Sequence, residues 1–261
     1  MSGEGRPIPT YPDLSGKVAV VTGGSRGIGA ATCRMLGANR VKVAVVARSR
    51  PAIDALVGEL RDSGAEAIGI CADCGDEAQL TGMRSQIEEE LGPIDIALAF
   101  AGGFDAFTPI EEISSDEWRE VIESNLTSTF LTVREVIPSM IERETGVLVT
   151  MSSNGGRLLD KPLTASYAAA KAGVIQFTRH LAMELGPKGI RANVLAPATV
   201  ASERIERIMD AESRANVARM SPLGTMGTPE DCALATLFLV SDSARWLTGV
   251  TLDVAGGRIM L

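Results

Sequence analysis

The sequence predicts an α/β protein with one doubly wound domain, in which a seven-stranded parallel sheet carries helices on both faces. Short, continuous apolar runs alternate along the chain with longer segments of helical periodicity, which is the pattern of strands buried on both sides. Right-handed crossovers between such strands wind the chain over both faces of the sheet. The 261 residues suit one large domain, and no repeat or linker divides them.

The alternation can be assigned segment by segment. Strands are expected at Lys17–Thr22, Val41–Ala47, Ala67–Ile70, Ile94–Phe100, Gly146–Met151, Ile190–Leu195 and Val250–Val254. Helices are expected at Gly29–Leu36, Ala52–Asp62, Glu77–Leu91, about 116–141, Ala165–Leu185 and Pro229–Val240. Two helix starts carry capping signals: Ser114 precedes Glu117 by three residues, and Thr228 stands before Pro229.

Two segments lie outside this alternation. Residues 1–16 contain three prolines and no apolar core of a signal peptide, so we expect a loose, flexible leader before a folded domain at 17–261. Residues 198–221 are charged and helix-prone, with one apolar face formed by Ile205, Ile208, Met209, Val217 and Met220. A lid over a site and an ordinary pair of surface helices both fit this second segment.

Composition excludes several classes of function. The formal net charge of −8 argues against nucleic acid as the main partner, and no apolar run approaches the ~18 residues of a membrane span. Four cysteines form no disulfide framework, so a reducing compartment, the cytoplasm, is expected. Cys71 and Cys74 form a CxxC, but no second ligand pair accompanies it and the single histidine, His180, is far along the chain, so no metal site is predicted.

A glycine-rich turn follows the first strand and opens the first helix. Glycines 23, 27 and 29 have the spacing TGxxxGxG, which lets the backbone turn tightly and approach a pyrophosphate at the helix N-terminus. This context predicts a dinucleotide site. The residues of the turn expected to contact the dinucleotide are Gly23, Ser25, Arg26, Gly27, Ile28 and Gly29.

The residues after the second strand favour NADP(H) over NAD(H). An acid there hydrogen-bonds the adenosine ribose in NAD-binding sites, but this chain has Ala47, Arg48, Ser49 and Arg50 instead. Arg26, in the phosphate turn, is a second guanidinium near the same point, and guanidinium groups suit a 2′-phosphate. The alternative is that Arg48 and Arg50 are solvated loop charges. We expect Arg48 and Ser49 to contact the cofactor.

A tyrosine and a lysine four residues apart are the candidate acid–base pair. Tyr167 and Lys171 project from one helix face, and a lysine ammonium favours the phenolate form of a neighbouring tyrosine. Ser152 and Ser153 end a buried strand upstream, at the carboxyl edge of the sheet where ligands bind. A serine hydroxyl there can donate to the oxygen of a substrate.

Taken together, the motifs resemble the short-chain dehydrogenase/reductase family from about Lys17 to Leu261. The order matches at TGGSRGIG (22–29), Asp73, Ala101-Gly102, Asn125, Ser153, Tyr167 with Lys171, Pro197, Leu247-Thr248-Gly249 and Gly256-Gly257. Within the family, the chain is most similar to 3-oxoacyl-thioester reductases. The resemblance implies a Rossmann fold and an NADPH-dependent oxidoreductase that transfers a hydride between nicotinamide and a carbonyl or secondary alcohol, with a 3-oxoacyl thioester as one possible substrate.

The resemblance also implies a role for each matching residue. Tyr167 protonates the carbonyl oxygen, and Lys171 lowers the pKa of Tyr167 and binds the nicotinamide ribose. Ser153 polarises the carbonyl, and Asn125 holds a water that links Lys171 to solvent. Further cofactor contacts are expected at Asp73, Cys74, Ala101, Gly102, Pro197, Val200 and Ser202. A homotetramer is also implied, and the long helices show apolar residues that we expect on their outer faces: Val133, Val136, Ile137, Ala168 and Val174.

Several positions depart from the family pattern. Ala99-Phe100 replaces two asparagines, Ala198 replaces a glycine where a Cβ penalises positive φ, and Arg40 replaces a glycine, so that Asn39 is expected to take the left-handed position. Ala255 and Thr225 replace an expected aspartate and arginine. The alternative function is a catalytically silent dinucleotide-binding regulator, but an intact tetrad favours an enzyme.

The substrate pocket is expected between three segments. Its walls are predicted at Gly103–Phe107, Arg157–Leu163 and 198–221, with an apolar lining from residues such as Phe104 and Leu158. Arg157 and Lys161 are candidates for binding an anionic part of a substrate, and solvated charges are the alternative.

Overall fold

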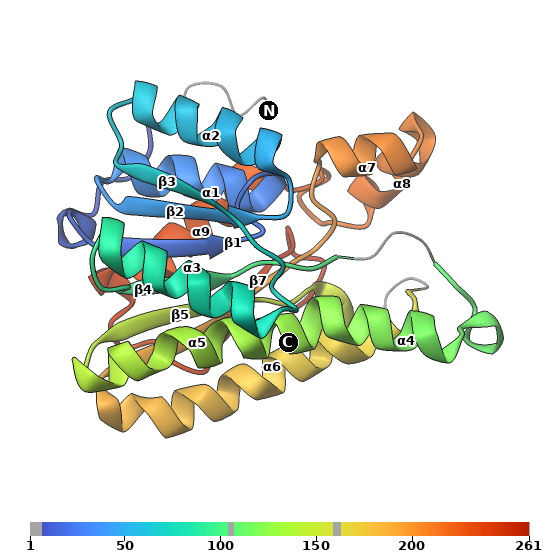
Figure 1. The fold of residues 1–261 in the computed structure, drawn as a ribbon. Coiled ribbons are helices and arrows are strands. Elements are labelled where there is room, and N and C mark those ends of the chain that lie inside the picture. Colours follow the sequence, from blue (N-terminus) through green and yellow to red (C-terminus); the bar gives the residue numbers. More distant parts are fainter. Residues whose placement is uncertain (1–6, 104–106, 159–162, 261) are drawn as a thin grey trace.

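The computed structural model describes residues 7–103, 107–158 and 163–260 (Figure 1). Its centre is a seven-stranded sheet in the order β3-β2-β1-β4-β5-β6-β7, with every neighbouring pair parallel. The strands are β1 Val18–Thr22, β2 Lys42–Ala47, β3 Ala67–Cys71, β4 Ile96–Ala99, β5 Gly146–Met151, β6 Ile190–Pro197 and β7 Thr251–Val254. The strand order reverses between β1 and β4, so the doubly wound sheet predicted from the alternation of apolar runs is confirmed.

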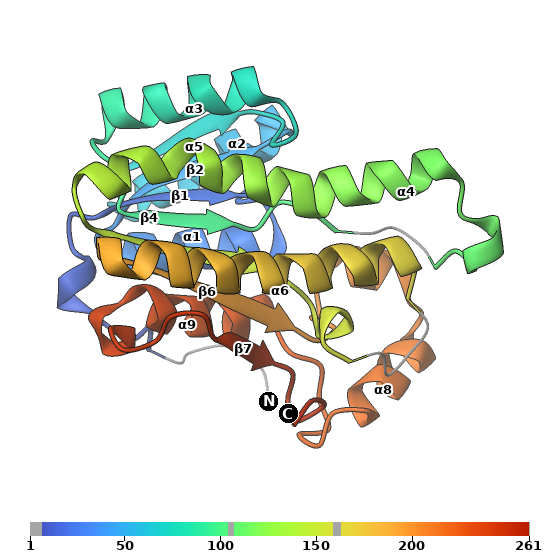
Figure 2. The same ribbon diagram turned by 90° about the horizontal axis from the view of Figure 1, so that it is seen from below.

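Helices cover both faces of the sheet, as Figures 1 and 2 show. One face carries α1 Gly27–Ala38, α2 Arg50–Asp62 and α9 Pro229–Val240, and the other carries α3 Glu77–Glu90, α5 Ser128–Glu142 and α6 Ala165–Leu185. Alternate residues of β1 enter the two cores: Val21 packs with the first set of helices and Val20 with the second. Burial on both faces is why the strands are continuous apolar runs rather than alternating ones.

The long helical stretch predicted at about 116–141 is present, but it is not one regular α-helix. It begins as α4 Ser115–Ile122, passes through a π-helical turn at Glu123–Thr127 and continues as α5. At its start, Ser114 accepts from the Glu117 N–H at 3.0 Å, as the capping pattern predicted. The π-turn contains Asn125, whose contacts with a distant loop are described below. Helical periodicity alone cannot reveal such a turn, because the flanking residues keep good helical propensity.

The N-terminal segment is mostly exposed from residue 7 onward but is anchored to the domain, so this part is less loose than the leader expected at residues 1–16. Leu14 is buried in the core, and Pro12–Leu14 form a 3-10 turn. The Tyr11 N–H donates to Asn39 Oδ1 at 2.7 Å, and Asn39 Nδ2 donates to the Pro9 carbonyl at 3.0 Å. The segment is therefore held at the end of α1.

The left-handed residue at this turn is Arg40 and not Asn39, contrary to expectation. Arg40 has φ of 61°, whereas Asn39 has φ of −93°. The side chain of Asn39 is buried and also donates to the Met35 carbonyl at 3.0 Å, so its hydrogen bonds fix it as the C-cap of α1. The turn to β2 therefore falls on the next residue, whose side chain is exposed to solvent.

The segment at 198–221 forms α7 Glu203–Ile208 and α8 Ala211–Arg219, which extend beyond the carboxyl ends of the strands (Figure 1). The predicted apolar face is only partly covered, because Ile208 is 52% exposed and Met220 is 39% exposed. This placement suits a lid and a surface helix pair equally.

The apolar faces expected for oligomer contacts need correction. Val133 and Val136 of α5 and Val174 of α6 are buried in the core, whereas Ile137 and Ala168 are partly exposed. The exposed large apolar side chains of α4–α6 are instead Trp118, Phe130 and Met183. Among the described residues, no helix has the length and apolar character needed to cross a membrane.

Candidate active site

Helix α6 places the predicted acid–base pair on one buried face. Tyr167 and Lys171 are 8% and 2% exposed, and the Lys171 Nζ lies 5.7 Å from the centroid of the Tyr167 ring. Lys171 Nζ donates to the Met151 carbonyl at 2.9 Å, at the end of β5. Burial lowers the pKa of Lys171 from its usual 10.5 to about 8. A buried cation is therefore held beside the phenol, at the carboxyl edge of the sheet.

The two serines that follow β5 have different environments. Ser152 is buried, and its hydroxyl donates to the Lys171 carbonyl at 2.7 Å, so it ties β5 to α6. Ser153 is half-buried, and its Oγ accepts from the Gly155 N–H at 3.2 Å. The turn after β5 approaches α6 closely at Gly156, where a Cβ would lie 2.6 Å from the Lys171 carbonyl carbon, so glycine is required there. Ser153 is thus the serine of the two that is only half-buried and, among the residues that the structure describes, makes no hydrogen bond to α6.

Asn125 braces the loop after β4. Its side chain is fully buried; Oδ1 accepts from the Gly103 N–H and Nδ2 donates to the Gly103 carbonyl, both at 2.9 Å. Gly102 is required here, since it has φ of 132° and a Cβ would lie 2.6 Å from Asn125 Oδ1. The π-turn that carries Asn125 packs against α6, where a Cβ on Gly173 would come within 2.9 Å of Leu126. The site therefore joins α6, β5 and the loop after β4.

The glycine-rich turn has the geometry of a phosphate cradle. Gly23 and Gly27 have φ of 64° and 51°, and a Cβ on Gly29 would lie 2.2 Å from the Gly23 carbonyl oxygen. Helix α1 begins without a side-chain cap at Arg26, so its first N–H groups are left for another acceptor. Ser25 and Ile28 are half-buried in the turn. The cradle fits the pyrophosphate of a dinucleotide.

The arginines near this turn differ in their contacts. The Arg50 guanidinium donates to the Gly69 carbonyl at 3.1 Å and lies 3.5 Å from the Asp54 carboxylate, so it is engaged within the protein. Arg26 and Arg48 are exposed, and the described part of the chain offers neither of them an ion-pair partner. Ser49 precedes α2 and is half-buried. Arg26 and Arg48 therefore remain the candidates for a phosphate.

The end of β3 carries the next predicted contacts. Asp73 Oδ1 accepts from the Gly75 N–H at 2.9 Å, which fixes its carboxylate in a tight turn. Cys74 is buried, and burial raises the pKa of its thiol to about 11, whereas Cys71 is exposed and its Sγ lies 3.4 Å from the Arg48 carbonyl. No group of three or more metal-ligating side chains occurs within the residues described.

The loop after β4 keeps its place despite the missing asparagines. The Thr22 hydroxyl accepts from the N–H groups of Phe100 and Ala101, at 3.1 and 3.3 Å, and donates to the Leu98 carbonyl. Phe100 itself is buried in the core. Thr22 was not among the predicted site residues, although its position in the TGGSRGIG motif is the signal that marks it.

The end of β6 carries the remaining predicted contacts. Pro197 ends the strand, and Val200 is buried and bridges to Gly227. Ser202 caps α7 by accepting from the Ile205 N–H. Ala198 does not have positive φ, so its Cβ is accommodated without backbone strain.

One predicted pocket residue has a different partner. Arg157 Nε lies 3.3 Å from Asp253 Oδ1 on β7, and the two side chains are only 15% and 18% exposed. Burial raises the pKa of Asp253, although Arg157 acts in the opposite direction. Arg157 is therefore paired with Asp253, a partner that differs from both alternatives left open by the sequence, an anionic substrate group and solvent. Phe104 and Lys161 lie outside the described residues, whereas Leu158 and Phe107 are exposed at the predicted walls.

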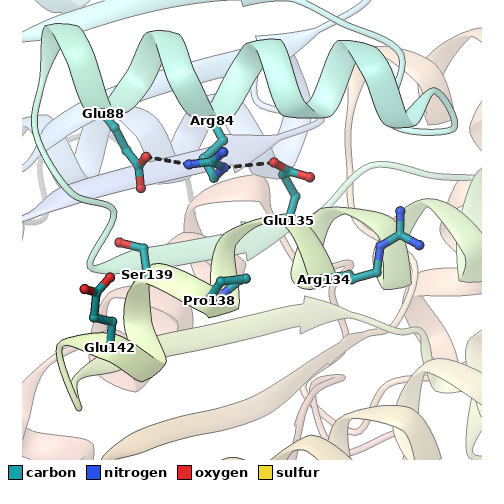
Figure 3. Close-up of a pocket in the computed structure, with 7 residues that line it drawn as sticks. All are labelled: Arg84, Glu88, Arg134, Glu135, Pro138, Ser139 and Glu142. Atoms are coloured by element: carbon teal, nitrogen blue, oxygen red, sulfur yellow. Dashed lines mark hydrogen bonds and ion pairs between the residues drawn. The ribbon is translucent and has the colours of Figure 1, made fainter.

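A cavity of about 370 Å³ lies between α3 and α5, and Figure 3 shows the residues that line it. Arg84 bridges Glu88 and Glu135 across it, at 2.7 and 2.8 Å. Its lining residues are Arg84, Glu88, Arg134, Glu135, Pro138, Ser139 and Glu142. The cavity is lined by α3 and by the second half of α5, which leads into the N-terminal end of β5. Ser153 follows the opposite, C-terminal end of that strand. The cavity is thus separate from the candidate active site.

The chain is similar to known proteins over most of its length. The sequence model of the family described as short chain dehydrogenase matches residues 17–213. The chain is 36% identical over 253 residues to 3beta-hydroxysteroid dehydrogenase 1 of Eggerthella lenta, covering 96% of each sequence. It is 34% identical over 255 residues to 3-oxoacyl-(acyl-carrier-protein) reductase FabG of Escherichia coli (strain K12), covering 95% of this chain and 100% of that one. A 3-oxoacyl-(acyl-carrier-protein) reductase from Brucella melitensis, solved with bound NAD, is 30% identical with a TM-score of 0.91, covering 100% and 98% of the two chains.

Proposed function

The chain belongs to the short-chain dehydrogenase family, and from this premise we propose that it is an NADP(H)-dependent reductase of carbonyl substrates or, in reverse, a dehydrogenase of secondary alcohols. An oxidoreductase that acts on alcohol and carbonyl groups is what family membership establishes. The single observation that carries the finer proposal is the buried Tyr167–Lys171 pair beside Ser153, at the carboxyl edge of a sheet that also carries a phosphate cradle.

The catalytic steps follow from the chemistry of these side chains. When bound, nicotinamide supplies or accepts the hydride. During reduction, the Tyr167 hydroxyl gives its proton to the carbonyl oxygen, and the Lys171 ammonium stabilises the phenolate that remains. The Ser153 hydroxyl donates to the same oxygen and stabilises the charge that develops there. Asn125, in its π-turn, holds a water that returns protons to Lys171.

The residues that hold the dinucleotide lie along one edge of the sheet. The N-terminus of α1 receives the pyrophosphate, Asp73 accepts from the adenine amino group, and Lys171 and Tyr167 face the nicotinamide ribose. The other proposed contacts are Gly23, Ser25, Arg26, Gly27, Ile28, Gly29, Arg48, Ser49, Cys74, Ala101, Gly102, Pro197, Val200 and Ser202. Exposed Arg26 and Arg48, without ion-pair partners among the described residues, support a preference for the 2′-phosphate of NADP(H).

The substrate class to test first is the 3-oxoacyl thioester, because the relative FabG, at 34% identity, is named as a 3-oxoacyl-(acyl-carrier-protein) reductase. Steroids and cyclic alcohols come next, given the hydroxysteroid dehydrogenase and a cyclohexanol dehydrogenase of Rhodococcus sp. at 38% identity. The partly exposed walls at Leu158 and Phe107 support an apolar substrate.

The assembly is proposed to be a homotetramer in the cytoplasm. Exposed Trp118, Phe130 and Met183 on α4–α6 support contacts between copies of the chain. Four cysteines without a disulfide suit a reducing compartment.

A substrate panel tests the proposed reaction. Purified protein is mixed with NADPH and, in turn, oxo-thioesters, steroids, quinones and sugars, and NADPH absorbance is followed. Oxidation that depends on one class of carbonyl substrate supports the proposal. The outcome that indicates a silent regulator is tight NADPH binding without turnover. Turnover would then be absent both in the reduction of every carbonyl substrate with NADPH and in the oxidation of the matching alcohols with NADP.

A further inference from the structure

We propose that Asn154 is a positioning residue that sets the direction of the Ser153 hydroxyl. Its side-chain amide donates to Ser153 Oγ, and the Ser153 proton then points at the oxygen of the substrate. The inference rests on the proposed function, in which Ser153 donates to that oxygen.

The first step is the contact between the two side chains. Ser153 Oγ lies 3.3 Å from Asn154 Oδ1 and donates to it, while accepting from the Gly155 N–H at 3.2 Å. A serine hydroxyl has one proton. In this arrangement the proton is committed to Asn154, and Ser153 has none to give to a substrate oxygen.

The second step is an unpaired donor. Asn154 is only 4% exposed, and its Nδ2 has no hydrogen-bond partner among the described residues. A buried N–H without a partner is unfavourable, whereas a carbonyl oxygen with an unused lone pair is easier to accommodate. Rotation of the amide by half a turn exchanges the two atoms without changing its shape. That rotation brings Nδ2 to Ser153 Oγ and removes the buried unpaired donor.

The third step is the consequence for catalysis. With Asn154 Nδ2 and the Gly155 N–H both donating to Ser153 Oγ, both lone pairs of the hydroxyl are occupied. Its proton is then directed away from the turn, and donors to the oxygen make the hydroxyl itself a stronger donor. Ser153 is thereby prepared to stabilise negative charge on the carbonyl oxygen.

The turn that carries the pair is rigid enough for this purpose. The Asn154 carbonyl accepts from the N–H groups of Arg157 and Leu158, both at 2.9 Å. A Cβ on Gly155 would lie 2.1 Å from Leu163 Cδ1, so the turn is closely packed. The side chain of Asn154 can therefore rotate while its backbone stays in place.

A double-mutant cycle tests the proposal. Asn154→Asp keeps the shape but, when ionised, only accepts, so it holds the Ser153 proton; we expect kcat to fall about 100-fold, as when one donor to the oxyanion is lost. Asn154→Leu has similar size without hydrogen bonds, and we expect about a 10-fold loss. In a Ser153→Ala background, each substitution should cost less than about twofold, because Ser153 is the group through which Asn154 acts.

The pH profile supplies a readout that a merely structural role would not change. A protonated carboxyl can donate to Ser153 Oγ, so the activity of the Asn154→Asp variant relative to wild type should rise as the pH is lowered. The Asn154→Leu variant should show no such rise. NADPH titration and thermal unfolding, measured for every variant, report whether the fold and the cofactor site are intact.

The outcomes separate two failures. If Ser153→Ala keeps most of the wild-type kcat, the proposed role of Ser153 is wrong. Suppose that Ser153→Ala loses activity, but that the Asn154 substitutions lower kcat by the same factor in the Ser153→Ala background as in the wild type. Only the inference about Asn154 is then wrong. Greater harm from Asn154→Leu than from Asn154→Asp, without a rise at low pH, would also overturn it and indicate a packing role.

Discussion

The ammonium group of Lys171 donates to the Met151 carbonyl at 2.9 Å, so α6 reaches the end of β5 through a cation that is almost completely removed from solvent. Burial is the cause of its low pKa, about 8, because water no longer stabilises the charge. The proposed mechanism requires that charge beside Tyr167. The site therefore keeps a cation where the fold alone would favour an apolar side chain.

Lys171→Met should stabilise the cofactor-free protein and abolish its activity. Between pH 8 and 10.5 the unfolded chain holds the Lys171 proton and the folded chain does not. The free energy of unfolding of the wild type should therefore rise with pH across this window. Below pH 8 the lysine is charged in both states, and the full cost of burying the charge remains. At pH 7 we expect the variant to gain about 2 kcal/mol in free energy of unfolding, after allowing for the lost hydrogen bond. Urea unfolding at pH 7 and pH 10 measures this.

Lys188→Met is the matched control for that measurement. Lys188 lies in the short 3-10 turn Gly186–Lys188 after α6 and is only half-buried. We expect little change in its free energy of unfolding at either pH. A Lys171→Met variant that is less stable than wild type at pH 7 would show that the hydrogen bond to Met151 outweighs the cost of the buried charge.

Tyr167→Phe should remove turnover and leave cofactor binding intact. The substitution deletes only the hydroxyl that donates the proton, and general acid catalysis typically contributes about 10²–10⁴ in rate, so we expect kcat to fall at least about 1000-fold. Stopped-flow and steady-state assays measure kcat, and fluorescence titration measures NADPH affinity. Tyr11→Phe changes the other tyrosine of the chain and should leave both quantities unchanged. Substantial turnover by Tyr167→Phe would remove Tyr167 from the mechanism.

Cofactor preference should depend on the turn after β2. Charge-assisted hydrogen bonds contribute roughly 1.5–3 kcal/mol each, and solvent reduces this at exposed Arg48, so we expect about a 10- to 100-fold preference for NADPH over NADH in kcat/KM. Ala47→Asp combined with Arg48→Ile should reverse it, because an acid repels the 2′-phosphate and accepts from the ribose hydroxyl. Isothermal titration with both cofactors, repeated at higher salt, measures the change.

Arg50→Ile is the matched control, since Arg50 is already engaged by Asp54 and the Gly69 carbonyl. The preference of the Arg50→Ile variant for NADPH over NADH should match that of wild type. Equal or tighter binding of NADH by wild type would mean that Arg26 and Arg48 point into solvent.

The parts of the fold that the sequence predicts are those set by local pattern. Buried parallel strands need apolar side chains on both faces, so their positions and the doubly wound sheet follow from continuous runs such as Val18–Thr22. The Thr228–Pro229 helix start is confirmed as well, with Thr228 and Asp231 forming a capping box. These features depend on residues close in the chain.

What the sequence does not predict depends on contacts between distant segments. The π-turn at Glu123–Thr127 is linked to the pairing of Asn125 with Gly103, and the ion pair of Arg157 joins a loop to β7. Ser152 and Ser153 are adjacent and look alike in sequence, and the hydrogen bond from Ser152 to the Lys171 carbonyl is what distinguishes them in the structure. Such partners are more than fifteen residues apart, beyond the reach of local periodicity.

Arg40→Gly should stabilise the protein. Arg40 has φ of 61°, a conformation that costs an ordinary residue about 1–2 kcal/mol, and part of that gain is offset by the greater freedom of glycine in the unfolded chain. We expect a net gain of about 0.5–1 kcal/mol, measured by urea unfolding. Asn39→Gly should instead destabilise by about 2 kcal/mol, because it removes the hydrogen bonds to Tyr11, Pro9 and Met35. A loss of stability in Arg40→Gly would contradict the argument from strain.

The ion pair between Arg157 and Asp253 sets up a final prediction, in which two substitutions are less harmful than either alone. Both side chains are mostly buried, and burial raises the pKa of Asp253 although Arg157 opposes it. The attraction between the charges therefore does not fully compensate for their removal from water. Since the folded state holds the Asp253 proton more tightly than the unfolded state, this group reduces stability as the pH rises above its ordinary value of 3.8.

Arg157→Met alone leaves a buried carboxylate without its cation, and Asp253→Leu alone leaves a buried guanidinium, so each should lower the free energy of unfolding by about 2–3 kcal/mol at pH 7. The double variant replaces both charges with apolar side chains of comparable size and should lie within about 1 kcal/mol of wild type. Urea unfolding of all four proteins gives the coupling energy. Because Arg157→Met leaves a carboxylate that can be protonated, its deficit should shrink as the pH falls toward 4, whereas that of Asp253→Leu should not. Additive losses in the double variant would show that the two side chains act independently.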